Sequence, residues 1–192
     1  MRGHALKLTC FMLLALGLTA APSALAAPGP GGVAFEEAPV VPPSPEQPVV
    51  PGAEAKLLDD GVAAAPAAAP DAVKQAIWAA NKIIGRPYRY GGGHARGFVD
   101  RGYDCSGAVS YALHGGDLLD DPLDSSSFLS WGKAGAGDWI TVYTSPGHAY
   151  AVIAGLRLDT SAAGDPRGGK GPRWRPSLRS SRGFKARHPL GF

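Results

Sequence analysis

Two stretches of the chain carry apolar residues at helical spacing. In the first, the apolar positions recur at steps of three and four residues and are Val73, Ile77, Ala80 and Ile84. Residues spaced in this way lie along one face of a helix. Asp71 favours the start of this helix electrostatically, and Gly85 favours its end. The pattern predicts a helix beginning near residue 71, where we expect the folded domain to begin.

The second stretch runs from Asp104 to about His114 and is followed by two glycines. Its apolar positions are again at helical spacing and are Ala108, Val109, Ala112 and Leu113. This pattern predicts a short helix with Cys105 in its first turn. Between the two helices, residues 86–104 are rich in glycine, which indicates a loop whose backbone passes close to another part of the molecule.

Three short runs of β-forming residues follow a polar, turn-prone segment at 117–137. They cover residues 139–143, 148–154 and 156–160. In the second run, Tyr150 and Val152 share a face with His148 if the segment is extended. Gly155 predicts a tight hairpin between the second and third runs.

The first 26 residues have the three-part layout of a secretory signal peptide. Arg2 and Lys7 precede an apolar run over residues 8–21, and small residues at 24–26 predict cleavage after Ala26. The apolar run is shorter than the roughly 20 residues that a membrane-spanning helix needs. We therefore expect a secreted protein without stable membrane insertion after signal cleavage.

Two further segments flank the expected domain at 71–163. Residues 27–70 are dominated by Ala, Pro, Gly and Val, which predicts a disordered linker. Such a linker would let a domain reach away from a membrane or wall, or would be a tail with no role beyond export.

Residues 164–192 form a basic extension of unknown role. After Asp165 it carries no acidic residue and eight basic ones, which are Arg167, Lys170, Arg173, Arg175, Arg179, Arg182, Lys185 and Arg187. A solvated surface is the simpler interpretation, and attraction to an anionic wall polymer is the alternative.

Charge and cysteine content narrow the function further. The formal charge is +3, and loss of Arg2 and Lys7 with the leader would leave 17 basic against 16 acidic side chains, which argues against a dedicated nucleic-acid binder. Cys10 lies in the leader, so the mature chain would hold Cys105 alone. An unpaired thiol in an exported protein is either buried and inert or a reactive nucleophile.

The position of Cys105 favours reactivity. The N-terminus of a helix directs partial positive charge and free N–H groups at a side chain in its first turn, which stabilises a thiolate. The same N–H groups can donate to the oxyanion of a tetrahedral intermediate. Gly107 keeps this turn free of a bulky side chain. Cys105 is therefore the candidate nucleophile.

A cysteine nucleophile also needs an imidazole base within hydrogen-bond reach. Four histidines lie outside the leader. His94 is in the glycine-rich loop, His114 is too far along the cysteine helix, and His188 is in the basic extension. His148 opens a β-run and is the candidate base by elimination. Asp159, on the adjoining strand of the expected hairpin, is the candidate for the group that orients it, with an outward, solvated carboxylate as the alternative.

Four sequence blocks in order resemble the NlpC/P60 family of cell-wall cysteine peptidases. They are Gly85-Arg86-Pro87-Tyr88-Arg89-Tyr90-Gly91-Gly92, Tyr103-Asp104-Cys105-Ser106-Gly107, Gly137-Asp138-Trp139 and Gly147-His148. The resemblance runs from about residue 71 to 160. It implies an α+β, papain-like fold, with N-terminal helices packed on a small antiparallel β-sheet. The family's catalytic cysteine and histidine map onto Cys105 and His148.

The resemblance also implies an activity and a location. It implies a bacterial peptidoglycan hydrolase that cleaves an amide bond of the stem peptide, secreted, periplasmic or cell-wall associated, with no metal and no cofactor. Tyr88, Tyr90, Asp104 and Ser106 are the candidate substrate-binding residues. Asp159 stands where the family commonly has histidine, asparagine or glutamine, so the third catalytic position departs from the pattern.

Two other functions fit the same sequence. One is a peptidoglycan-binding module that kept the fold without turnover. The other is an amidase or transferase of the same fold, which would act on a different bond or pass the acyl group to an amine. The protein partners of the chain are not indicated by the sequence.

Overall fold

The computed structural model describes residues 46–165, 169–175 and 177–192 of the chain. The expected signal peptide, and residues 27–45 of the expected linker, lie outside these residues. The described part is a mixed α+β unit with helices α1 (Asp71–Ile83) and α2 (Cys105–Gly115) and a 3₁₀ turn, η1 (Ser127–Ser130). No helix in it is long and apolar enough to cross a membrane.

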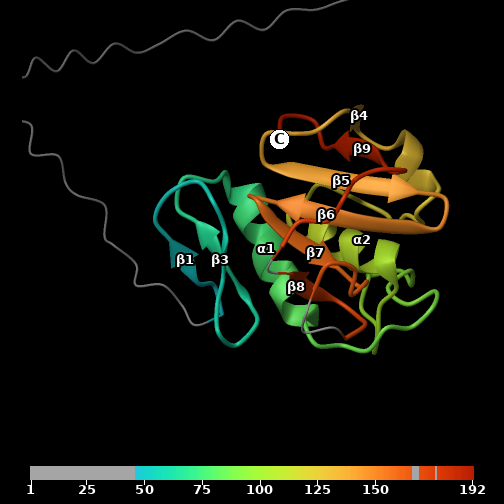
Figure 1. Ribbon diagram of the computed structural model, residues 1–192, viewed down its shortest axis with the longest axis horizontal. Helices are drawn as coiled ribbons and strands as arrows, with labels where there is room; N and C mark the ends of the chain where they lie inside the picture. Colours follow the sequence, from blue (N-terminus) through green and yellow to red (C-terminus); the bar gives the residue numbers. More distant parts are fainter. Residues whose placement is uncertain (1–45, 166–168, 176) are drawn as a thin grey trace, which may run out of the picture. The chain divides into compact units, whose positions relative to one another are not determined.

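The larger sheet has six strands in the order β4-β9-β5-β6-β7-β8, and every neighbouring pair is antiparallel. Its strands are β4 (Lys133–Ala134), β5 (Ile140–Ser145), β6 (His148–Ile153), β7 (Leu156–Asp159), β8 (Arg173–Arg175) and β9 (Lys185–His188). The three β-runs expected from the sequence are strands β5, β6 and β7. The sheet and the two helices pack side by side, as Figure 1 shows.

The two helices hold the core against the sheet. The stripe expected on α1 is buried at Val73, Ile77 and Ala80, and it packs in one cluster with apolar residues of α2 and of the central strands. Close approach of the two helices requires glycine at the end of α2, because a Cβ atom at Gly115 would lie 2.1 Å from that of Ala79. α2 also contacts β6, and hydrogen bonds of Cys105 with His148 and the N–H of Ala149 place the start of the helix beside the start of the strand.

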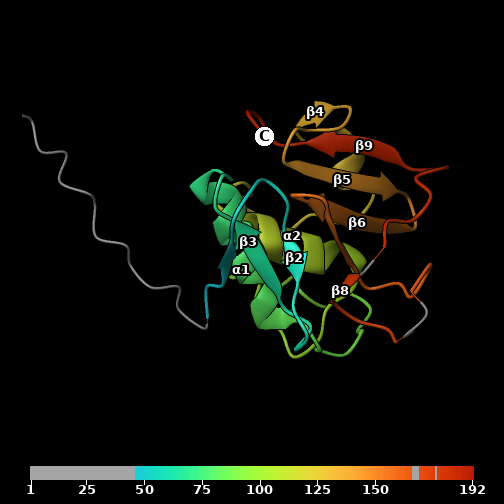
Figure 2. The same ribbon diagram turned by 60° about the vertical axis from the view of Figure 1, so that its left-hand side comes forward.

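The structure corrects the expected linker over residues 46–70. These residues form a second, small sheet in the order β1-β3-β2, from β1 (Val49–Val50), β2 (Lys56–Leu57) and β3 (Ala63–Pro66), which Figure 2 shows beside α1. Alanine is too small to build a core by itself, but β3 lies against α1 and buries all three of its alanines. Composition could not show that a helix would cover this strand.

Asn81 on α1 ties this small sheet to the rest of the domain. Its Oδ1 accepts hydrogen bonds from the backbone N–H of Ala63, at 2.9 Å, and from Nε1 of Trp174 in β8, at 2.8 Å. Its Nδ2 donates to the carbonyl of Ala63 at 2.9 Å. One side chain thus joins segments from both ends of the described chain.

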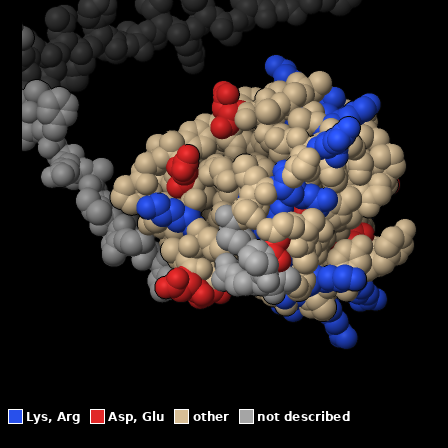
Figure 3. All heavy atoms as spheres, viewed as in Figure 1, with Lys and Arg blue, Asp and Glu red and all other residues tan. Residues whose placement is uncertain are grey.

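The basic extension is also part of the domain, and the expected boundary at residue 163 is wrong. β8 forms an edge of the large sheet beside β7, and β9 lies between β4 and β5. Arg175 is fully buried, and Arg187 donates to the carbonyls of Trp131 and Gly132. On the face in Figure 3, Lys and Arg side chains lie in several separate groups. The extension is therefore not simply a solvated basic tail.

Replacement of Asn81 should destabilise the whole domain. In Asn81→Leu the N–H and C=O of Ala63 and the indole N–H of Trp174 lose their partner, and we expect a loss of about 3 kcal/mol in the free energy of unfolding. Urea unfolding measures this loss. Lys82→Ala, at the exposed neighbouring position, should change stability by no more than about 0.5 kcal/mol. Equal stability of the two variants would contradict the role given to Asn81.

Candidate active site

Cys105 is the first residue of α2, and Asp104 is the N-cap of that helix. The Asp104 carboxylate accepts hydrogen bonds from the N–H of Gly107 at 2.7 Å, the N–H of Gly91 at 3.0 Å and the hydroxyl of Ser106 at 3.2 Å. A short polar side chain in this position satisfies the N–H groups that the first helical turn leaves open. Asp104 thereby fixes the turn that carries the sulfur.

The glycine-rich loop passes directly over this turn. A Cβ atom at Gly107 would lie 2.0 Å from the carbonyl oxygen of Gly92, so a side chain at this position would collide with the loop backbone. The N–H of Asp104 donates to the same carbonyl at 3.1 Å. The close backbone approach expected from the sequence is therefore an approach of the loop to the helix that begins at Cys105.

His148 is the first residue of β6 and follows the turn at Pro146 and Gly147. Burial raises the pKa of the Cys105 thiol, but hydrogen bonds with the His148 imidazole and the N–H of Ala149, together with the imidazolium charge, outweigh burial and lower the pKa below its ordinary value. Cys105 is 9% exposed and lines a cleft. The structure thus brings the candidate nucleophile and the candidate base within hydrogen-bond reach of each other.

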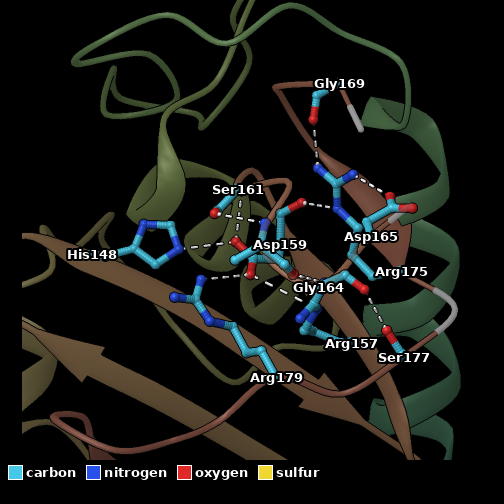
Figure 4. A network of polar contacts seen from close by, with 11 residues as sticks. His148, Arg157, Asp159, Ser161, Gly164, Asp165, Gly169, Arg175, Ser177 and Arg179 are labelled. Carbon is cyan, nitrogen blue, oxygen red and sulfur yellow. Dashed lines mark hydrogen bonds and ion pairs between the residues drawn. The ribbon is translucent and has the colours of Figure 1, made fainter. Parts of the chain in front are cut away.

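Asp159 ends β7 and reaches His148 from the neighbouring strand. β6 and β7 pair from Ile153 with Leu156 to Ala151 with Leu158, and the next pair in this register puts Asp159 on the face of His148. His148 Nε2 lies 2.9 Å from Asp159 Oδ1, a contact drawn in Figure 4. This leaves Nδ1 of the imidazole for Cys105. Asp159 is buried, so the outward, solvated alternative does not hold.

The buried carboxylate controls the protonation of the imidazole. Burial lowers the pKa of His148, but hydrogen bonds with Asp159 and Cys105, and the negative charges of both, raise it to about 9. Burial likewise raises the pKa of Asp159, and hydrogen bonds from His148, the N–H of Ser161 and Arg179 bring it below its usual range. These shifts favour a thiolate on Cys105 beside an imidazolium on His148, with an ionised carboxylate behind the ring.

Two clefts adjoin the Cys105–His148 pair. The first has a volume of about 430 Å³ and exposes Cys105 together with Tyr88, Tyr90, His94, Asp104 and Ser106. The second, of about 320 Å³, lies on the His148 side and is lined by Tyr88, His148, Thr160, Ser161, Ala162 and Lys170. Tyr88 borders both clefts. Burial, then the charges of Cys105 and Asp104, raise the pKa of Tyr88, so its hydroxyl stays a hydrogen-bond donor.

The candidate substrate-binding residues are all at the first cleft, but they differ in how free they are. Tyr90 is 91% exposed, whereas both oxygens of Asp104 already accept hydrogen bonds from the protein. Asp104 is thus first of all a residue that shapes the cleft. Among the described residues, no group of three or more His, Cys, Asp or Glu side chains could hold a metal ion.

His94 also lines the first cleft, although it is not among the site residues predicted from the sequence. Its Nε2 lies 3.0 Å from Asp104 Oδ1 and 3.3 Å from the Ser106 hydroxyl. In the sequence, His94 lies in the glycine-rich loop, and it was considered only as a candidate base. The signal that could have located it is the loop's close approach to the cysteine turn, which brings any polar loop residue to the cleft.

Comparison with models of known protein families gives no match, and comparison with curated proteins gives none either. Among solved structures, the chain is similar to the peptidoglycan hydrolase RipB from Mycobacterium tuberculosis, with 24% sequence identity and a TM-score of 0.44. This similarity covers 61% of the chain and 64% of the RipB chain.

The raised pKa of His148 should depend on both of its partners. We expect its ring resonances to titrate near pH 9 by NMR, because imidazolium is favoured by Asp159 and the Cys105 thiolate. In Asp159→Asn and in Cys105→Ala the midpoint should fall, since each variant removes a negative charge and leaves the burial. Resonances of His114, at the far end of α2, should coincide in all three proteins. An unchanged His148 midpoint in Asp159→Asn would contradict this coupling.

Proposed function

We propose that this chain is a secreted peptidoglycan hydrolase that cleaves an amide bond of the stem peptide through a Cys-His thiol mechanism. The observation that carries the proposal is the continuous arrangement of Asp159, His148 and Cys105 beside an open cleft. The class of substrate comes from the resemblance of the surrounding sequence blocks to the NlpC/P60 family. Export through the expected signal peptide belongs to the same proposal.

The geometry supports a two-step acyl transfer. The Cys105 thiolate attacks the amide carbonyl, and N–H groups that the first turn of α2 leaves without internal partners can donate to the oxyanion. The His148 imidazolium then gives its proton to the departing amine, which leaves a thioester on Cys105. In the second step, neutral His148 takes a proton from water, the water oxygen attacks the thioester, and the thiolate returns.

The same mechanism orients the substrate across the two clefts. The leaving amine must lie within reach of His148, because it takes its proton from that ring. The second cleft contains His148 and lacks Cys105, so it receives the leaving part of the substrate. The first cleft contains Cys105 and receives the acyl part, beside Tyr88, His94 and Ser106.

A binding module without turnover is less well supported. Such a module needs neither a thiolate nor a buried carboxylate behind its histidine, and burying a charged group without a use for it is costly. The amidase and transferase alternatives keep the same chemistry. They differ only in which bond enters the clefts and in whether water or an amine resolves the thioester.

Digestion of peptidoglycan tests the proposal. Purified protein should release soluble peptide fragments whose new ends, read by mass spectrometry, identify the amide bond that is cut. Cys105→Ala should release none, because no thioester can form. Release by both proteins would contradict a cysteine mechanism. Binding to insoluble peptidoglycan with no cleavage by the unmodified protein would favour the binding module instead.

Replacement of the two histidines at the site should have different effects. His148→Gln should reduce turnover by about 100-fold or more, because it removes the proton donor and the partner of the thiolate. His94→Gln should mainly raise KM, since His94 contacts Asp104 and Ser106 at the cleft wall. Steady-state rates on the fragment identified by digestion measure both effects. A loss of kcat in His94→Gln equal to that in His148→Gln would show that the assignment of the base is wrong.

A further inference from the structure

The carboxylate of Asp159 is held from two sides, and the second side belongs to the C-terminal extension. Its Oδ1 contacts His148 Nε2 at 2.9 Å and accepts a hydrogen bond from the N–H of Ser161 at 2.8 Å. Its Oδ2 accepts a hydrogen bond from Nη1 of Arg179 at 3.2 Å. Figure 4 shows His148 and Arg179 approaching the carboxylate together. The extension therefore contacts the group that orients the base.

Arg179 is itself held in place by aromatic rings. Its guanidinium carbon lies 5.3 Å from the ring centroid of Tyr150 and 5.2 Å from that of Phe184. A cation within about 6 Å of an aromatic ring centroid is attracted to the ring. The Phe184 ring also meets the His148 ring edge-on, with centroids 6.1 Å apart. Arg179 thus contacts Asp159, and Phe184 contacts both Arg179 and His148.

The other nearby arginine makes a weaker contact with the carboxylate. Arg157 Nε lies 3.8 Å from Asp159 Oδ2, within ion-pair range, and it is one of the buried nitrogens with no hydrogen-bond partner among the described residues. Arg157 donates through Nη2 to the carbonyl of Ala163 at 2.8 Å. Arg157 is fully buried in β7, so it contributes to the packing of the fold in addition to its ion pair with Asp159. Arg179 is the arginine that hydrogen-bonds the carboxylate directly.

We propose that Arg179 is a positioning residue which acts through Asp159: it fixes the carboxylate that orients His148, and so makes the C-terminal extension part of the active site. Without Arg179, Oδ2 would lose its hydrogen bond, and the carboxylate could turn away from the imidazole. The imidazolium would then be less stable, and the thiolate would lose its partner. The proposal rests on the proposed function only in taking Cys105, His148 and Asp159 as the working groups.

The pH dependence of Cys105 alkylation by iodoacetamide tests this proposal without any substrate. Mass spectrometry of the peptide that contains Cys105 separates it from Cys10. In Arg179→Gln the acid limb of the alkylation profile should move to higher pH, and alkylation below the midpoint should slow by roughly threefold to tenfold. Arg179→Lys keeps the charge and should restore part of the rate. Arg182→Gln, at an exposed position of the same segment, should match the unmodified protein.

A double variant separates positioning from a general loss of structure. If Arg179 acts through Asp159, then Arg179→Gln should change the profile little when Asp159→Asn is already present. An undiminished shift in that background would overturn the proposal, because it would then reflect the packing of Tyr150 and Phe184. A profile of Arg179→Gln that superimposes on that of the unmodified protein would also overturn it. Failure to cleave peptidoglycan would contradict the proposed function alone, since alkylation needs no substrate.

Discussion

Burial of the Cys105 side chain opposes its ionisation, and the surrounding groups of the site favour the thiolate strongly enough to outweigh burial. Burial is the largest influence on the thiol and raises its pKa. The helix start contributes partial positive charge, the N–H of Ala149 donates to the sulfur, and His148 supplies a full positive charge. His148 can stay protonated in a partly buried position because Asp159 stands behind it. Each group is therefore needed to keep the preceding one charged.

The six-stranded antiparallel sheet sets the positions of the two polar residues behind Cys105. The pairing of β6 with β7 sets His148 and Asp159 on one face, and a slip of one residue would turn the carboxylate to the other side. The packing of α2 against β6 then brings Cys105 to the imidazole. A helix distant in sequence thus meets a hairpin whose two strands are consecutive in the chain.

The elements that could be predicted from the sequence are those that follow from local patterns of apolar residues and glycines. The apolar stripe predicted α1, the glycine pair predicted the end of α2, and Gly155 predicted the turn between β6 and β7. Sequence reasoning likewise placed Cys105 and His148 where the structure joins them, since a helix start and a strand start are readable in the sequence. Asp159 was accessible to the same reasoning because a short hairpin fixes which residues face each other.

The remaining parts depend on contacts that no local pattern contains. Alanine-rich residues 63–65 form a buried strand only because α1 covers them, and Asn81 satisfies the backbone of Ala63 from a helix turn that looks unremarkable in sequence. The basic extension looked like a solvated tail because arginine is usually exposed. Arg175 and Arg179 point inward because they have buried acceptors, such as the Asp159 carboxylate for Arg179.

Two buried arginines lie side by side near Asp159, and nearby carboxylates offset the repulsion between them. Arg157 and Arg175 are paired directly across β7 and β8, where like charges repel, and both are fully buried. Asp159 and Asp165 supply the opposing charges, through ion pairs with Arg157 and Arg175 respectively. These surroundings lower the pKa of Asp159, so the carboxylate is expected to stay ionised when His148 loses its proton. In the proposed mechanism Asp159 therefore orients and stabilises the imidazolium as a fixed charge and does not itself take the proton, which favours the Cys105 thiolate.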